Sequence, residues 1–259
     1  MAGKNGHSLI TTEKFKQLFQ TMLENRLHRE QHGALNGSNA AHHEAGAASI
    51  ALDLQPVDTL LVASEMHPAS MTRNNGANHL AARKNGTPHK KAMLLPAVDA
   101  SASLHLSQAI AAALRHKLDK DNGITVIFLD HFSDASFDLS AYADAFEVAI
   151  KSNLPIIFVA ETANGSTLIE QLRGKELILP YIAVDAHDAV AIYRVAQESI
   201  VRTREGGGPA LVELTSYTLD GELEDALVKL HRYLIGKGLP AAAWKNAATK
   251  RFEKRNSSV

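Results

Sequence analysis

The chain has 259 residues, of which 45% are hydrophobic and 21% charged, and it contains no cysteine. This is enough apolar material for one large domain or two small ones, and it excludes disulfides, iron–sulfur clusters, thiolate zinc sites and cysteine nucleophiles. With 27 Lys and Arg against 28 Asp and Glu, the net charge of -1 argues against general attraction to nucleic acid or an anionic membrane. We expect a cytoplasmic protein, because the start lacks the apolar core of a signal peptide and no apolar run is long enough to span a bilayer.

The first part of the chain predicts helices and a short strand before a long polar segment. Apolar residues at three- and four-residue spacing predict a helix from Thr11 or Thr12 to about Arg29. An alanine-rich helix follows over residues 40–54, and a strand begins at 58. Residues 64–97 are polar and contain two Asn-Gly pairs and several prolines, which predicts a loop region around one weak helix.

From residue 104 onward, helical and strand patterns alternate. Helices are expected over residues 104–118, around 142–150, from Asp185 or Asp188 to 200, and over 222–235 and 240–254. Strands are expected over residues 124–129, 154–160, 181–184 and 210–215. Because these runs are apolar at nearly every position, we expect strands covered on both faces. The pattern predicts an α/β fold with an open, mainly parallel sheet and helices on both faces.

Several local motifs point to structure and not to chemistry. His42-His43-Glu44 lacks a second histidine one turn later, so we interpret it as a solvated polar face and not as a zinc site. The glycines at 206–208 follow a helix and precede a strand, which indicates a helix terminator and not a phosphate cradle. The basic residues between 245 and 255 are interpreted as a solvated helix face. No P-loop, G-x-S-x-G or G-x-G-x-x-G motif is present.

Polar residues follow the two central strands. Asp130 comes after the strand over 124–129, and Asn164 follows the strand over 154–160. Ligands of open parallel sheets bind beyond the carboxyl ends of the strands, and these oxygen donors suit a Mg²⁺ ion that also holds a diphosphate. The alternative is that both residues are turn formers and caps.

Residues 153–161 and 180–215 resemble the alpha subunit of the thiamine-diphosphate-dependent 2-oxo acid dehydrogenases, the E1 components of pyruvate, branched-chain and acetoin dehydrogenase complexes. The resemblance extends over residues 104–130 and 225–239, and more faintly over 44–63. It implies one thiamine-diphosphate-binding-fold domain over 1–259, with a helical lead at about 11–55, a polar loop region at about 64–97 and a helical tail at about 222–255. It also implies oligomers whose active sites form between subunits.

The resemblance assigns three cofactor residues. The family motif for Mg²⁺ and diphosphate begins G-D-G after one strand, and Asp130 matches its aspartate. The motif ends N-N after the next strand; its second asparagine, a metal ligand, falls on Ala163, with Asn164 one position later. The family arginine that grips the diphosphate, in Y-R-x-H-G, corresponds to Arg73. Thiamine diphosphate would therefore be held by Arg73, Asp130 and Asn164, with Asp130 and Asn164 on the metal; no catalytic residue is assigned.

Other family positions differ. The tyrosine and histidine of Y-R-x-H-G are Thr72 and Asn75, and the glycines flanking the motif aspartate are lost. The G-I-V-G motif, which approaches the aminopyrimidine through its backbone, falls on Val-Asp-Ala-Ser at 98–101, whose side chains obstruct that approach. The family loop beginning H-G-H-S is absent, and Glu222 stands where its histidine would be.

Two hypotheses follow from this comparison of motifs. In the first, the chain is a degenerate alpha-type subunit with a structural or regulatory role, and it binds thiamine diphosphate weakly or has no cofactor. In the second, it is an active dehydrogenase that decarboxylates a 2-oxo acid with thiamine diphosphate and Mg²⁺, and passes the acyl group to a lipoyl carrier. The expected partners are a second copy or a beta-type E1 subunit, within a lipoyl acyltransferase complex.

A third hypothesis, outside this family, is a flavodoxin-like binding module that does not pair through its alanine-rich helices. These helices, over residues 40–54 and 104–118, carry small residues over much of their surface. Such surfaces permit either close packing within the subunit or a subunit interface.

Overall fold

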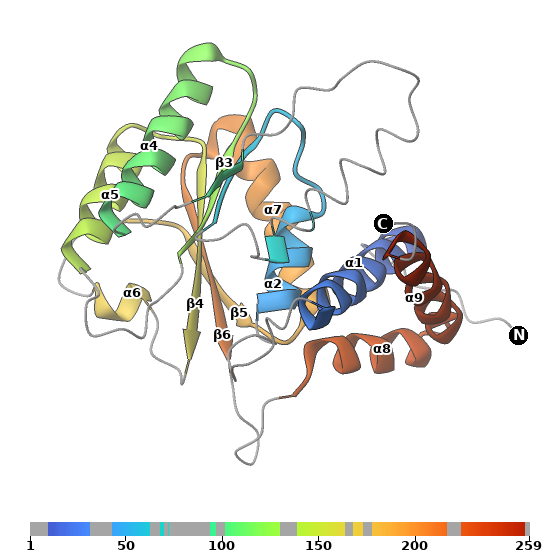
Figure 1. The fold of residues 1–259 in the computed structure, drawn as a ribbon. Coiled ribbons are helices and arrows are strands. Elements are labelled where there is room, and N and C mark those ends of the chain that lie inside the picture. The colour runs from blue at the N-terminus through green and yellow to red at the C-terminus, as the bar shows by residue number, and fades with distance from the viewer. Residues whose placement is uncertain are drawn as a thin grey trace, which may run out of the picture.

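A computed structural model describes residues 10–31, 43–62, 68–69, 72, 94–96, 102–129, 139–163, 168–172, 178–216 and 224–256. Its centre is a parallel sheet of six described strands in the order β2-β1-β3-β4-β6-β5 (Figure 1). The strands are β1 (Thr59–Val62), β2 (Leu94–Pro96), β3 (Thr125–Leu129), β4 (Ile156–Ala163), β5 (Tyr181–Asp185) and β6 (Ala210–Ser216). The predicted α/β class and the parallel sheet are confirmed.

Helices cover both faces of the sheet. One face carries α4 (Ala102–Asp119), α5 (Leu139–Lys151) and the short α6 (Leu168–Gln171). The other face carries α2 (His43–Ala51) and α7 (Ala189–Arg202). Beyond α2 lies a further layer of α1 (Thr12–Gln31), α8 (Ala226–Gly236) and α9 (Ala241–Asn256), which pack on one another (Figure 1).

The alanine-rich helix α2 is enclosed within the chain. Its residues from Glu44 to Ala51 are buried, and it packs on α1, α7 and α8. At Gly46 the helix comes so close to β6 that a Cβ atom would collide with Cδ1 of Leu214. The small residues of α2 therefore serve packing within the subunit, which is one of the two uses left open above.

Two expectations about strands are corrected. The end of the polar region over 64–97 contains β2, which pairs with β1 at the edge of the sheet; an edge strand tolerates Pro96, because only one side of it needs N–H donors. The strand at 181–184 is also not covered on both faces: β5 pairs only with β6 among the described strands, and Tyr181 is 49% exposed. Ile182, which points to the opposite face from Tyr181, is exposed as well, although β5 also packs on α7.

The helix boundaries have identifiable causes. Asp188, and not Asp185, caps α7, because its side chain accepts hydrogen bonds from the amides of Val190 and Ala191. The glycine segment ends that helix as predicted: a π-helical turn, Thr203–Gly207, contains Gly206 at φ 87° and is followed by Gly208 at φ 76°. Asn153 donates a 3.2 Å hydrogen bond to the carbonyl of Gly206 and holds this turn against the start of β4.

The described part of the chain gives two further structural results. None of its helices is both long and apolar enough to cross a membrane. Within the same residues, no group of three or more His, Asp or Glu side chains is arranged to hold a metal ion. The basic residues of α9 are exposed, as expected for a solvated helix face.

Candidate functional site

The carboxyl edge of the sheet is where the sequence places the cofactor. β3 and β4 are parallel neighbours, with Leu129 opposite Ala160. Asp130 follows the last residue of β3 and Asn164 follows the last residue of β4, so both predicted ligands come after adjacent strand ends. Asp130, Asn164 and Arg73 themselves lie outside the described residues, and their assignment remains a prediction.

The residue before Arg73 is fixed to the first helix. Thr72 is buried and donates a 2.9 Å hydrogen bond to the carbonyl of Pro68. The side-chain amide of Asn25, on α1, donates to both the Thr72 hydroxyl at 2.8 Å and the Pro68 carbonyl at 3.1 Å. Thr72 stands where the resembled family has tyrosine, and here its hydroxyl serves an internal contact.

A carboxyl group lies beneath this edge on the α5 and α6 side of the sheet. Glu213 of β6 is fully buried, and its Oε1 accepts a hydrogen bond from the amide of Leu168 at the start of α6. Nearer the strand ends, the hydroxyls of Thr162 and Thr215 lie 3.3 Å apart. Glu213 thus fixes the point at which the chain resumes after the segment that carries Asn164.

A second and larger polar cluster lies on the opposite face of the sheet. Arg26 of α1 donates to both oxygens of the fully buried Glu44, at 2.7 to 3.2 Å, and to both oxygens of Asp225. Asp225 also caps α8 by accepting from the amide of Val228. One guanidinium therefore joins α1, α2 and the start of α8, and such charge-assisted, two-pronged contacts are strong and directional.

Two further groups extend this cluster, which we call the arginine–carboxylate cluster (Arg26, Arg29, Glu44, Glu161 and Asp225). Nη1 of Arg29 lies 3.5 Å from Oε1 of Glu44, and Glu161 near the end of β4 also attracts Arg29. Glu161 approaches α2 as well, since a Cβ on Gly46 would lie 3.4 Å from its Oε1. The cluster therefore reaches the carboxyl end of β4.

Burial and pairing set the pKa values in this cluster. Burial lowers the pKa of Arg26, but hydrogen bonds to Glu44 and Asp225 outweigh burial and raise it overall. Burial raises the pKa of Glu44 and lowers that of Arg29, because both charges are removed from water. For Asp225, the hydrogen bonds from Arg26 and the helix amides outweigh burial and lower the pKa. Arg26 is therefore held in its charged form between two carboxylates.

The arrangement corrects the interpretation of residues 42–44. Glu44 does not belong to a solvated polar face: it is fully buried and paired with Arg26 and Arg29. His42 and the side chain of His43 lie outside the described residues. The sequence does indicate that two arginines lie on the buried side of α1, because Arg26 and Arg29 continue its apolar stripe at helical spacing.

The described charges at this edge are already committed to one another. Arg26 and Arg29 face Glu44, and Lys229 of α8 lies 2.7 Å from Asp185 at the end of β5. Asp225 and Glu161 also face these arginines, so four carboxylates stand against three cations. Among the described residues, each of these three cations therefore already has a carboxylate partner.

The raised pKa of Glu213 predicts a pH dependence of stability. Burial is the main cause of the raised pKa, opposed by hydrogen bonds from the amides of Leu168 and Ile169. The folded protein therefore keeps this proton at pH values where the unfolded chain, with a glutamate pKa of about 4.3, has released it. The stability that protonated Glu213 contributes is fully present below the unfolded pKa of about 4.3. It is lost as the pH rises through the pKa of Glu213 in the folded protein. Glu213→Gln should flatten this decline, as measured by urea unfolding across the acidic to neutral range.

The matched control for this measurement is Glu198→Gln, because Glu198 is exposed on α7. Its unfolding free energy should follow that of the wild type at every pH. A Glu213→Gln profile as steep as the wild type would contradict a neutral Glu213 in the folded protein.

Comparison with known proteins identifies the family. A family model described as Dehydrogenase E1 component matches residues 40–225. The subunit alpha of acetoin:2,6-dichlorophenolindophenol oxidoreductase from Bacillus subtilis (strain 168) is 32% identical over 45% of this chain and 37% of its own length. The Cupriavidus necator protein of the same name is 28% identical over 71% of this chain and 55% of its own length.

A plant relative gives the same result. The chloroplastic pyruvate dehydrogenase E1 component subunit alpha-3 of Arabidopsis thaliana is 30% identical over 54% of this chain and 37% of its own length. This chain thus spans between 37% and 55% of the length of these three relatives. The family match rules out the unrelated flavodoxin-like module, and the chain belongs to the dehydrogenase E1 component family, with an alpha-subunit-like sequence.

Proposed function

We propose that this chain is an E1 alpha-subunit-like protein whose binding of thiamine diphosphate is lost or greatly weakened, and whose role is structural or regulatory. The observation that carries the proposal is the identity of the last residue of β4. Ala163, where the resembled family has its metal-binding asparagine, is the last residue of β4 and pairs with Ser216. A methyl group supplies no oxygen ligand, so the residues present do not fit a Mg²⁺ diphosphate, and we derive no catalytic step through one.

Charge at the same edge of the sheet supports the proposal. The described arginines there are neutralised by Glu44 and Asp225, Asp185 is paired with Lys229, and Glu161 adds negative charge near the end of β4. Each charge-assisted hydrogen bond to the cofactor that is lost weakens the binding free energy by about 1.5–3 kcal/mol. With the family oxygen at 163 lost and the flanking glycine positions filled by side chains, the expected loss of affinity is several factors of ten.

The proposed role follows from the retained scaffold. The sheet, the helix layers and the ion pairs between them are intact in the described residues, so the surfaces for subunit assembly can persist without the cofactor. Two of the relatives are named as alpha subunits of an acetoin oxidoreductase. By analogy, we propose a beta-type E1 subunit as the partner of this chain.

A thermal-shift titration with thiamine diphosphate and Mg²⁺ tests the proposal. We expect no change in the melting temperature across the titration, because a ligand stabilises only a fold that binds it. A working cofactor site would instead add about 2.7 kcal/mol of stability at a hundredfold excess over the Kd.

Asp130→Ala is the matched control for this titration. If the wild type shows a concentration-dependent rise that this variant abolishes, Asp130 holds the metal and the chain is a cofactor-binding dehydrogenase component. That result would overturn the proposal. A flat titration for both proteins supports it.

A further inference from the structure

The two edges of the described sheet are protected differently. β2, at one edge, has three residues and ends in Pro96, which lacks an N–H donor. β5, at the other edge, pairs with β6 in unbroken register over five residues and contains no proline or bulge. Its one charged residue, Asp185, is the last, and residues 178–184 contain no Asp, Glu, Lys or Arg. β5 therefore lacks the prolines, bulges and central charges that normally keep another strand away from an edge.

The outer backbone groups of β5 have no partner strand among the described residues. In a parallel pair, every second residue of one strand bonds to the other strand. Just before β5, the carbonyl of Pro180 accepts a 2.9 Å hydrogen bond from an amide of β6. Just after β5, the amide of Ala186 donates a 3.0 Å hydrogen bond to a carbonyl of β6. The even-numbered residues therefore bond to β6, and the N–H and C=O groups of Tyr181 and Ala183 point away from the sheet.

Apolar side chains are exposed on both faces of this edge. Tyr181 is opposite Leu211 and lies on the side of α5 and α6, where it is 49% exposed. Ile182 points to the α7 side and is 39% exposed, and Ala183 is exposed as well. Ile178, just before the strand, is 87% exposed. A helix packed on one face of the sheet would leave either Tyr181 or Ile182 uncovered, whereas a strand beside β5 would cover both.

We propose that the outer edge of β5 binds an extended segment of a partner protein, which pairs with β5 as an additional strand. The open N–H and C=O groups supply main-chain hydrogen bonds to such a segment, and the exposed side chains select its sequence. The inference does not rest on the proposed function, because neither the cofactor nor its site takes part.

The edge also defines the chemistry of the segment. Its side chains must alternate between the face of Tyr181 and the face of Ile182, and both faces are apolar, so β-branched and other apolar residues fit on either side. A charged residue at its centre would lose water without gaining an ion pair, since residues 178–184 carry no charge. We therefore expect an uncharged, apolar segment that is extended over about five residues, or about 17 Å.

Fluorescence anisotropy of a labelled peptide, titrated with the full chain, tests the inference. The peptide copies Thr125–Leu129, an uncharged strand that pairs in parallel on both of its sides in this sheet, with lysines added at both ends for solubility. It should bind saturably. A second peptide with the same side chains, N-methylated at every residue of the strand, cannot donate main-chain hydrogen bonds. Its binding should be weaker by about tenfold or more, because several hydrogen bonds are lost.

Ala183→Pro tests the edge from the side of the protein. The N–H of Ala183 does not bond to β6, so proline leaves the described sheet intact but removes an outward donor, and binding should be lost. Ala183→Val is the matched control, because it keeps the N–H group and should bind the peptide like the wild type. Tyr181→Lys, which keeps the backbone and adds a charge to the edge, should weaken binding. Circular dichroism and thermal melting should show the same fold for all three variants.

Several results would overturn the inference. One is a wild type that does not bind the peptide saturably; another is equal binding of the N-methylated peptide or equal binding by Ala183→Pro. If Ala183→Pro proves unfolded, Tyr181→Lys decides, and unchanged binding by that variant would overturn the inference. Sedimentation velocity of the wild type identifies a second copy as the occupant: self-association that Ala183→Pro abolishes would assign the edge to this chain itself and not to a partner.

Discussion

Replacing Glu44 by alanine is expected to lower the free energy of unfolding by about 3–5 kcal/mol. The side chain is fully buried and neutralises Arg26 at 2.7 Å and Arg29 at 3.5 Å. Without Glu44, Arg26 keeps Asp225, but Arg29 loses its ion-pair partner and keeps only the attraction of Glu161. A buried charge without a partner costs several kcal/mol. Urea unfolding followed by far-ultraviolet circular dichroism measures the change.

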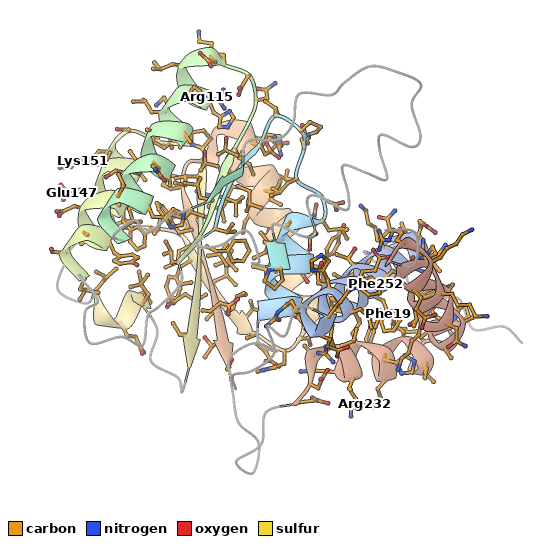
Figure 2. All side chains as sticks on the ribbon, viewed as in Figure 1. Phe19, Arg115, Glu147, Lys151, Arg232 and Phe252 are labelled. Atoms are coloured by element: carbon orange, nitrogen blue, oxygen red, sulfur yellow. The ribbon has the colours of Figure 1, made fainter. Side chains whose placement is uncertain are left out.

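The double variant Glu44→Ala with Arg29→Met separates this cause from the loss of packing. Removing the guanidinium of Arg29, which lacks its ion-pair partner in Glu44→Ala, should recover part of the stability. The free energy of unfolding of the double variant should therefore fall by less than the sum of the two single changes. Glu147→Ala is the surface control, because Glu147 pairs with Lys151 on the outer side of α5 (Figure 2) and should change stability by less than about 0.5 kcal/mol. A Glu44→Ala effect as small as that of the control would contradict a buried ion pair.

The parts of the fold that repeat a strong pattern were predictable. β3, β4 and β6 consist mainly of apolar, buried residues, and the prediction of a sheet covered on both faces is confirmed for them. Helix α7 was predicted by its apolar spacing, and its end by the glycines at 206–208. The apolar pattern and the glycines are local features of the sequence, so they are sufficient to find these elements.

Edges and buried charges were not predictable in the same way. An apolar run such as Tyr181–Asp185 has the same composition at an edge as in the centre, because sheet order depends on contacts far along the chain. Glu44 appeared solvated, since its partners Arg26 and Asp225 are distant in the sequence. Only the tertiary structure brings α1, α2 and the start of α8 together at one guanidinium, that of Arg26.

The candidate site shows the same limit. The sequence predicts that Asp130 and Asn164 follow adjacent strand ends, and the parallel pairing of β3 with β4 agrees with the strand part of that prediction. The position of the side chains depends on loops, whose conformation no hydrophobic period encodes. The structure adds what surrounds the edge, namely cations already paired with Glu44, Asp225 and Asp185.

The second large effect is expected at the opposite, amino edge of the sheet, where Asp58→Ala should also lower stability by about 3–5 kcal/mol. Both oxygens of the fully buried Asp58 accept from Arg204 at 2.8 Å. The same oxygens accept from the amides of Ile124 at 3.0 Å and Gln55 at 2.6 Å. Alanine leaves one guanidinium and two amides without these acceptors, and each unsatisfied buried group is costly. Urea unfolding gives the total loss.

Hydrogen exchange distinguishes the two large effects, because each cluster holds a different part of the fold. Asp58→Ala should reduce protection first at the starts of β1 and β3, where Thr59 donates a 2.9 Å hydrogen bond to the carbonyl of Ile124. Glu44→Ala should reduce it first in α1 and α2. Asp144→Ala, at an exposed position of α5, should do neither. If both large variants lost protection in the same segments, the two charge clusters would form one cooperative unit, and the assignment of separate anchors at the two edges of the sheet would be wrong.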